Sequence, residues 1–363
     1  SYNRRKFMAF TNNRIFWAIQ AVGVASNGKV TYTAIHGLQS VGITTSFNLE
    51  QIFEIGQISI YENIEDIPDV EVTLEKVLDG YPLIYHLCTR GYEANTLTGR
   101  SNQRASVALS IFGDVQDSAS GVPITQVTMS GMYVSSLSFT FPVEGSCTEA
   151  ITLVGNNKVW DNAAPHDFTG TIFDNTDVPL ALTSGTGGVQ RRENVVFVPP
   201  AADVSLDANG QVITSLATIL PPDIEGITSS GTNFPDADGD HTVHIQNMTV
   251  SSDFGRDNLT ELGQRGPYFR FINFPTEVTC EIEVISVKGD QVDALENAES
   301  NLSNRSIRIA LEEGLFINLG TSNKLANVTY GGADAGGGNA SVTYSYTTFN
   351  DFIVTHPQDP VVI

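Results

Sequence analysis

FNLEQIFEIGQISIYENIEDIPDVEVTLE, residues 47–75, is echoed later in the chain by FGRDNLTELGQRGPYFRFINFPTEVTCE, residues 254–281. The two stretches match at a fixed offset of 207 positions (254 − 47). The identical pairs are Phe47 with Phe254, Glu54 with Glu261, Gly56 with Gly263, Gln57 with Gln264, Tyr61 with Tyr268, Pro68 with Pro275 and, after one residue drops out, Val72, Thr73 and Glu75 with Val278, Thr279 and Glu281. These are nine identities, where background residue frequencies predict roughly two. A fixed-offset match of this kind indicates a duplicated structural unit.

The echo extends beyond this stretch. Gln39 matches Gln246 at the same offset, and the closing segment SLSFTFPVEG at 136–145 has an expected counterpart in SVTYSYTTFN at 341–350. A chain of 363 residues is long enough for two domains. The repeat therefore predicts two tandem copies of one fold.

Alternating apolar and polar residues predict a mainly β protein. The pattern appears at 30–33, 70–77, 106–112 and 132–141, with glycine, aspartate and serine clusters between the segments. Many short strands favour a sandwich or small barrel. We expect one flanking helix at 290–302, with Asp290 as its N-cap, and weaker short helices at 49–55 and 257–262.

The predicted organisation has four parts. Residues 1–28 form an N-terminal arm whose Arg4, Arg5 and Lys6 suit an acidic neighbouring subunit. Residues 29–161 form the first copy, and the Gly/Pro-rich stretch 162–194 links it to the second copy at 195–363. We expect a surface excursion near 221–242 within the second copy.

Charge and cysteine content narrow the function classes. The formal net charge is −22, with 41 acidic against 19 basic residues, and such a surface repels nucleic-acid phosphates. Three cysteines without a CxxC pair predict buried, reduced thiols. No segment is apolar enough to span a bilayer, so we expect no membrane partner.

No motif points to catalysis or to a cofactor. PDADGDHTVH at 235–244 gathers carboxylates and imidazoles, but its glycine and its twelfth residue do not fit a calcium loop. His86 and Cys88 are more consistent with core packing than with a nucleophile–base pair. There is no phosphate loop or nucleophile elbow, and there are too few paired carboxylates beside aromatics for a carbohydrate-acting enzyme. We therefore expect neither an enzyme nor a bound metal or cofactor.

The segments 251–284, 55–80 and 138–160 resemble tail tube proteins of tailed bacteriophages. That family implies a β-sandwich or half-barrel with a flanking helix, whose inner strands join around a ring and whose rings stack into a tube. Most members carry one such unit per chain, with six chains per ring. Two units per chain imply a ring of three chains with pseudo-sixfold symmetry, with a six-chain ring as the alternative.

The resemblance also implies partners and a location. They are the tail sheath, tape measure, tail terminator and baseplate proteins, and double-stranded DNA that passes through an acidic lumen without sequence-specific binding. The protein would belong to a virion tail assembled in the cytoplasm of a host bacterium. The competing interpretation is a capsid decoration or fibre-type adhesin that binds a surface receptor.

The repeated residues are the assembly candidates. Gly56 and Gly263 are expected at tight turns, and Pro68 and Pro275 at the start of the following strands. Glu54 and Glu261 are the first residues to test for contacts between subunits. Tyr61, Tyr268, Arg4, Arg5 and Lys6 complete the set.

Overall fold

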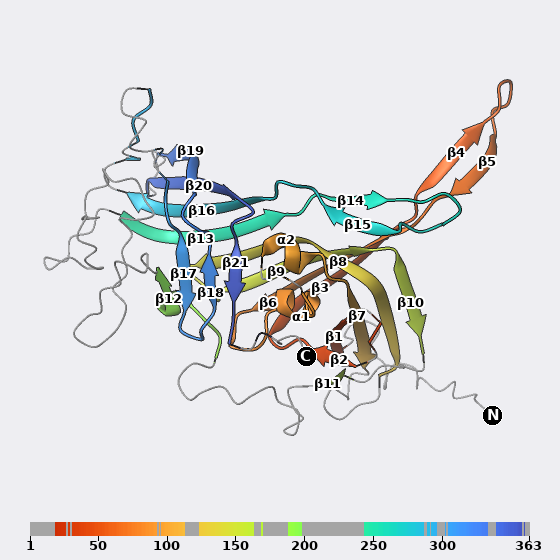
Figure 1. Ribbon diagram of the computed structural model, residues 1–363, viewed down its shortest axis with the longest axis horizontal. Coiled ribbons are helices and arrows are strands. Elements are labelled where there is room, and N and C mark those ends of the chain that lie inside the picture. Colours follow the sequence, from red (N-terminus) through yellow and green to blue (C-terminus); the bar gives the residue numbers. More distant parts are fainter. Residues whose placement is uncertain are drawn as a thin grey trace, which may run out of the picture.

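The computed structural model describes residues 19–359 apart from 27, 30, 93, 95, 113–122, 163–167, 170–187, 198–242, 287–288, 291, 296–301, 303, 333–338 and 358. Long antiparallel strands dominate it, which confirms the mainly β prediction (Figure 1). No helix in this part of the chain is long and apolar enough to cross a membrane.

The largest sheet crosses the whole molecule. Its first part consists of β3 (Leu38–Ser46), β6 (Asp69–Val77), β9 (Thr148–Gly155) and β8 (Thr125–Pro142), hydrogen-bonded in that order. Its second part consists of β13 (Val243–Asp253), β16 (Glu277–Ser286), β20 (Ser341–Phe349) and β19 (Lys324–Gly331), again in that order. Because β8 pairs with β13, the two parts form one continuous antiparallel surface (Figure 1).

Each part carries a second layer of strands. Under the first part lie β1 (Ile19–Ser26), β7 (Ala105–Phe112), the beginning of β8 and β10 (Asn157–Asp161), with β2 (Tyr32–Ala34) and β11 (Phe168–Thr169) at one side. Under the second lie β12 (Val195–Phe197), β17 (Arg308–Leu311), β18 (Phe316–Asn318) and β21 (Ile353–Thr355). The described elements also include helices α1 (Ile84–Cys88) and α2 (Leu97–Ser101) and a short 3-10 turn, η1 (Arg192–Asn194).

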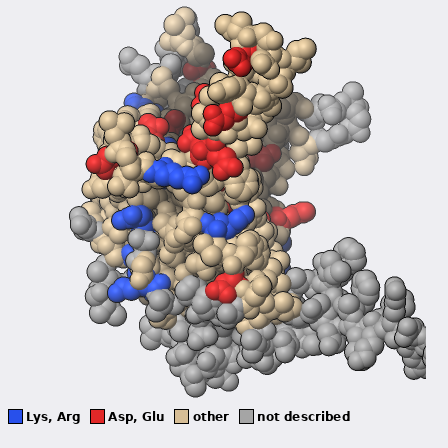
Figure 2. Space-filling model, turned by 90° about the vertical axis from the view of Figure 1, so that its right-hand side faces the viewer, with Lys and Arg blue, Asp and Glu red and all other residues tan. Residues whose placement is uncertain are grey.

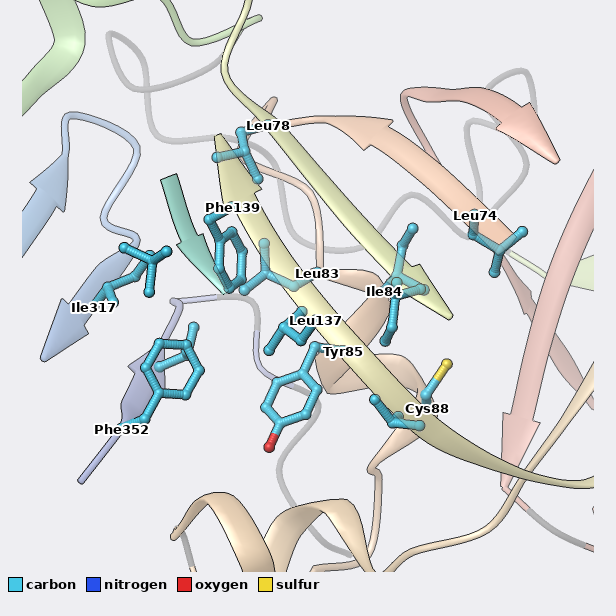
Figure 3. Packing of buried hydrophobic residues seen from close by; sticks show 14 of the residues in the cluster. Leu74, Leu78, Leu83, Ile84, Tyr85, Cys88, Leu137, Phe139, Ile317 and Phe352 are labelled. Carbon is cyan, nitrogen blue, oxygen red and sulfur yellow. The ribbon is translucent and has the colours of Figure 1, made fainter. Parts of the chain in front are cut away.

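Residue alternation explains which face of the sheet is buried. In β6, Val70, Val72 and Leu74 are buried while the residues between them are exposed, as the period of two in a strand requires. The buried face packs on the second layer and on α1. Figure 3 shows Leu137 of β8 lying between Tyr85 of α1 and Phe352 near β21, with Phe139 of β8 above them in the view. One continuous apolar core therefore runs beneath both halves.

The two halves share strand order, pairing register and bulge positions. The β3–β6 ladder shifts register at Gln39, and the β13–β16 ladder shifts at Gln246, 207 positions later (246 − 39). The remaining strands correspond at constant offsets, namely 208 for β6 and β16 (278 − 70), 193 for β9 and β20 (344 − 151) and 191 for β8 and β19 (328 − 137). Bulges are specific features of a sheet that related proteins retain. Their recurrence at equivalent places in the two halves therefore supports duplication of one structural unit.

The second layers also correspond. The order β1-β7-β8-β10 in the first half matches β12-β17-β18-β21 in the second. The β10–β21 offset is 193 (354 − 161), the same as for β9 and β20. We infer that residues 19–161 and 195–355 are two copies of one β-sandwich unit.

The pairing corrects two details of the repeat. Val70, rather than Val72, is the structural equivalent of Val278, because one residue is added after the second proline instead of being lost. The counterpart of the strand at 136–142 is β19, whereas 341–349 corresponds to β9. Both misalignments preserve the alternation of buried and exposed residues, so periodicity alone does not exclude them.

The short helices predicted at 49–55 and 257–262 are wrong. These residues belong to two β-hairpins, β4 (Leu49–Phe53) with β5 (Ile60–Glu65), and β14 (Arg256–Leu259) with β15 (Phe269–Ile272). The described residues of the predicted helix at 290–302 are not helical, and its residues 296–301 lie outside the described part of the chain. The 84–88 segment is a short helix, and it buries both His86 and Cys88.

Other predictions fall partly outside the described residues. Residues 19–26, placed in the arm, form β1, which pairs with β7, while Arg4, Arg5 and Lys6 lie outside the described part. So do the excursion at 221–242 and most of the linker at 162–194. The three cysteines are buried and reduced, as expected.

Candidate assembly surface

The repeated residues of the sequence lie in the two hairpins. In each, a turn of four residues closes with one backbone hydrogen bond of 3.2 Å, from Gln57 N to Glu54 O and from Gln264 N to Glu261 O. Gly56 and Gly263 adopt φ values of +91° and +86°, a conformation that favours glycine. The predicted turn role of these glycines agrees with this geometry.

The assembly candidates are spread along each hairpin instead of forming one cluster. Glu54 and Glu261 lie at the exposed tips, and Pro68 and Pro275 lie just before β6 and β16. Tyr61 is 67% exposed and Tyr268 is 70% exposed. No described contact joins the tip residues to the rest of the chain beyond the turn itself.

Large apolar side chains cover both hairpins. On the first, Ile55 and Ile58 are fully exposed, and on the second Leu262 is. The others that are more than a third exposed are Phe47, Leu49, Ile52, Phe53, Ile60, Ile64, Leu259, Phe271 and Phe274. An isolated two-stranded hairpin is marginally stable in water, and apolar patches of this kind mark interaction surfaces.

The second hairpin already has a binding surface, which is the first half of the same chain. The Arg256 guanidinium lies 4.9 Å from the centre of the Tyr133 ring and donates to the carbonyl oxygens of Val134 and Ser101. Burial lowers the pKa of Arg256 to about 10. Phe269 packs edge-on against Tyr133, with ring centres 5.9 Å apart.

A second arginine ties the same hairpin to the base of the first. Arg270 Nη2 lies 3.0 Å from Asp69 Oδ1 and 3.1 Å from Asn156 Oδ1. Phe254, at the start of the hairpin, is 1% exposed, and its amide donates to Ser135 O over 2.9 Å. The β14–β15 hairpin is therefore docked on the first half of the chain.

Within the described part of the chain, no such surface lies beneath the first hairpin. Every residue of β4 and β5 is exposed, and Figure 1 shows this hairpin projecting away from the body. Phe47, the equivalent of Phe254, is 72% exposed. The two copies therefore differ in the contacts that they make within one chain.

The two outer strands of the large sheet show the same difference. Among the described strands, β3 pairs only with β6, and β19 pairs only with β20. Tyr330 of β19 is 52% exposed, whereas its equivalent Phe139 is fully buried at the β8–β13 junction. Unpaired outer strands present backbone groups that can pair with another chain.

The face of the large sheet that points away from the core is polar and acidic. β6 places Glu71 and Glu75 on it, and β16 places Glu281 and Glu283 on it. Figure 2 shows acidic side chains gathering in the upper part of the view, above a band of Lys and Arg.

Buried ionisable groups lie where the halves meet. Glu149 accepts hydrogen bonds of 2.8 Å from the amides of Ile84 and Tyr85, and Lys76 pairs with Asp79 at 2.6 Å. Burial raises the pKa of both Glu149 and Glu313 to about 7. Across the described ranges, no group of three or more His, Cys, Asp or Glu side chains is arranged to hold a metal ion.

A further buried pair joins the end of the chain to α2. Arg100 binds the Asp359 carboxylate through two nitrogens, each at 2.7 Å. His86 lies beside this pair, and burial lowers its pKa to about 3. These groups form structural links between the halves, and their surroundings hold them in fixed positions.

No family model matches the sequence, and no curated protein matches it either. Several solved structures are similar to parts of the chain. The sixfold-symmetrised baseplate of the anti-feeding prophage aligns at TM-score 0.32 with 14% identity, over 40% of this chain and 95% of that one. The sheath–tube complex of an extracellular contractile injection system, PVC, aligns at TM-score 0.32 with 12% identity, over 45% and 99%. An Hcp protein crystal structure aligns at TM-score 0.23 with 10% identity, over 39% and 98%.

Sequence reasoning located the repeated stretch but predicted short helices where the two hairpins lie, and it did not predict how the outer strands pair. The β19 strand shares almost no identities with β8, since ANVTYG at 326–331 stands where SSLSFT stands at 135–140. The alternation of residues 326–331 and their position before 341–349 did indicate a strand. The sequence of a single strand, however, does not specify which strand it pairs with in a sheet.

Proposed function

We propose that the protein is the tube subunit of a tail-like particle, which associates with copies of itself into stacked rings. The observation that carries the proposal is the β8–β13 junction, where an outer strand of one unit's large-sheet part pairs with an outer strand of the next unit's part. The strand equivalent to β8 is β19, and the strand equivalent to β13 is β3. These two strands lie at the two ends of the sheet and lack this pairing among the described strands. A head-to-tail contact between them repeats the internal junction between chains.

The internal junction predicts the register of that contact. Within the chain, Ser252 lies opposite Leu137 and Val250 lies opposite Phe139. Moving the first members back by 207 and the second forward by 191 places Thr45 opposite Val328 (252 − 207; 137 + 191). It also places Ile43 opposite Tyr330. The partly exposed apolar residues of both outer strands then become buried together.

The number of units sets the size of the ring. A head-to-tail interface that closes by rotation makes a ring. Three chains supply six equivalent units, and a ring of six chains would supply twelve. We favour three, because six units match the arrangement expected from the family that the sequence resembles.

The acidic face is suited to line the lumen. Carboxylates such as Glu71 and Glu281 are exposed on the open face of the sheet. They repel DNA phosphates, so double-stranded DNA can pass without binding. The proposed location is a virion tail assembled in the host bacterial cytoplasm, in contact with sheath, tape measure, terminator and baseplate proteins.

Two experiments test the proposal. Purified protein examined by negative-stain electron microscopy is expected to form hollow filaments with threefold modulation. A discrete monomer or compact trimer under all conditions would instead favour a decoration or adhesin role. The second experiment pairs Thr45→Cys with Val328→Cys, which should give disulfide-linked chains because directly opposed strand residues lie within disulfide range.

The control for the disulfide experiment shifts the pairing by two residues. Thr45→Cys combined with Tyr330→Cys keeps both thiols on the same face of the sheet but moves them apart along the strand. Less cross-linking than in the first pair is expected. Equal cross-linking in both pairs would refute the register.

A further inference from the structure

The two hairpins occupy equivalent positions, but within one chain only the second is docked. We infer that the β4–β5 hairpin docks on the second half of a neighbouring copy, in the same way that β14–β15 docks on the first half of its own chain. The inference rests on the proposed ring of identical chains. It identifies which side chains meet, because the contacting residues in the strands and hairpins of the internal junction have equivalents, whereas Ser101 of α2 has none among the described elements.

The central contact changes from an aromatic pair to an ion pair. In the internal junction, Phe269 packs on Tyr133. Their equivalents are Glu62 (269 − 207) and Lys324 (133 + 191). Both are exposed in the single chain. In the contact between chains, a carboxylate thus meets an ammonium at the position where two aromatic rings meet in the internal junction. The two surfaces remain complementary although neither residue type is retained.

Lys324 can make this contact without losing its present one. Its Nζ donates to Leu302 O over 2.6 Å, and an ammonium has three donors. The Glu62 backbone pairs with β4, but its side chain makes no hydrogen bond or ion pair among the described residues, so its carboxylate is available to a partner.

The flanking contacts also have chemically complementary replacements. The Arg270–Asp69 pair becomes Asn63 (270 − 207) facing Glu277 (69 + 208), and an amide donor suits a carboxylate. Asn156, the other partner of Arg270, corresponds to Phe349 (156 + 193), which is 54% exposed. An apolar ring on the acceptor surface fits the isoleucine-rich hairpin better than an amide would.

The start of the hairpin extends the contact into the sheet. Phe254 is buried at the internal junction, and its amide donates to Ser135 O. The equivalent contact joins the Phe47 amide to the Ala326 carbonyl (135 + 191) of the neighbour. Phe47 would then be covered by the neighbouring chain.

Charge exchange tests the inference. Glu62→Lys and Lys324→Glu are each expected to weaken association of purified chains by about tenfold, because each places like charges together. The double variant, with both charges exchanged, is expected to restore association to near the wild-type level. Glu144→Lys is the matched control, since it makes the same charge change at an exposed turn between β8 and β9. Association is measured by sedimentation velocity over a concentration series, and circular dichroism melts check folding.

The outcomes separate this inference from the proposed function. Wild-type chains that do not associate would overturn the ring and the docking together. Association that survives both single changes, or that the double variant fails to restore, would overturn the docking alone. Cross-linking through Thr45→Cys and Val328→Cys would still report the ring in that case.

Discussion

Phe47 and Phe254 are equivalent residues with opposite surroundings, and truncating each should have opposite consequences. Phe254 is 1% exposed within one chain, whereas Phe47 is 72% exposed. Phe254→Ala removes a fully buried ring, and we expect it to lower the free energy of unfolding of the dispersed chain by about 3–5 kcal/mol. Phe47→Ala should leave that free energy nearly unchanged.

In the assembled state, truncation of Phe47 is the change expected to weaken the contact between chains. If the neighbouring chain covers Phe47 as the first half covers Phe254, each junction gains about 2 kcal/mol from burial of the ring. Its loss corresponds to roughly a 30-fold weaker association, since about 1.4 kcal/mol is a factor of ten.

Two measurements decide this prediction. Urea denaturation of dilute protein gives the free energy of unfolding of the single chain, and sedimentation velocity gives the association constant. The reasoning would be refuted if Phe47→Ala destabilised the dilute chain as much as Phe254→Ala. It would equally be refuted if Phe47→Ala left association unchanged.

Three further predictions concern the links within the chain. Burial raises the pKa of Glu313 from 4.5 to about 7, because the folded chain favours the neutral carboxyl group. The free energy of unfolding is therefore highest below pH 4.5 as far as this group is concerned, and it falls as the pH rises through 7. Glu313→Gln should therefore raise the free energy of unfolding at pH 8 by on the order of 2–3 kcal/mol and change it little at pH 4. Urea titrations at both pH values measure the two effects, and equal effects would show that ionisation of Glu313 is not their cause. Asp359→Asn leaves the buried Arg100 charge without its carboxylate, and a loss of about 3–5 kcal/mol is expected in the same titrations, while a loss below 1 kcal/mol would show that the pair is dispensable. Arg256→Ala removes the contacts with Tyr133 and two carbonyls, so limited proteolysis should cut the second hairpin as readily as the first, and unchanged protection would show that the apolar contacts suffice.

Much of the fold follows from the sequence pattern. The strand at 70–77 was predicted from alternation, which is strong where one face is buried and the other is exposed. The strand at 106–112 was predicted in the same way, although nearly all of its residues are buried in the structure. The repeat was visible because the hairpin turns need glycine at two equivalent positions and keep their neighbours. The mainly β fold class was thus accessible before any coordinates, and the repeat supplied the hypothesis of a tandem organisation.

The errors have a physical origin. Leu49, Ile52 and Phe53 are spaced like one face of a helix, and this spacing predicts a helix when each residue is assumed to face a core. In the structure they lie on an exposed hairpin, whose apolar residues satisfy no core of their own chain. If a neighbouring copy covers these residues, as inferred above, their spacing reflects contacts between chains, and packing within one chain does not predict it.

The candidate site was found only in part. Glu54 and Gly56 mark the hairpin tips, but Glu62 and Lys324 differ from their equivalents Phe269 and Tyr133. A search for identical residues in the two copies finds positions where both copies need the same backbone conformation, as at the hairpin turns. It misses positions where both sides of a contact have changed.

The fusion of two units through β8 and β13 has a kinetic consequence for assembly. Half of the junctions in a ring of six units would form as each chain folds, at the high effective concentration that a covalent connection provides. The cost in translational and rotational freedom then applies to three encounters rather than six. A ring built from such chains should nucleate at lower protein concentration than one built from separate units, and it can contain only an even number of them.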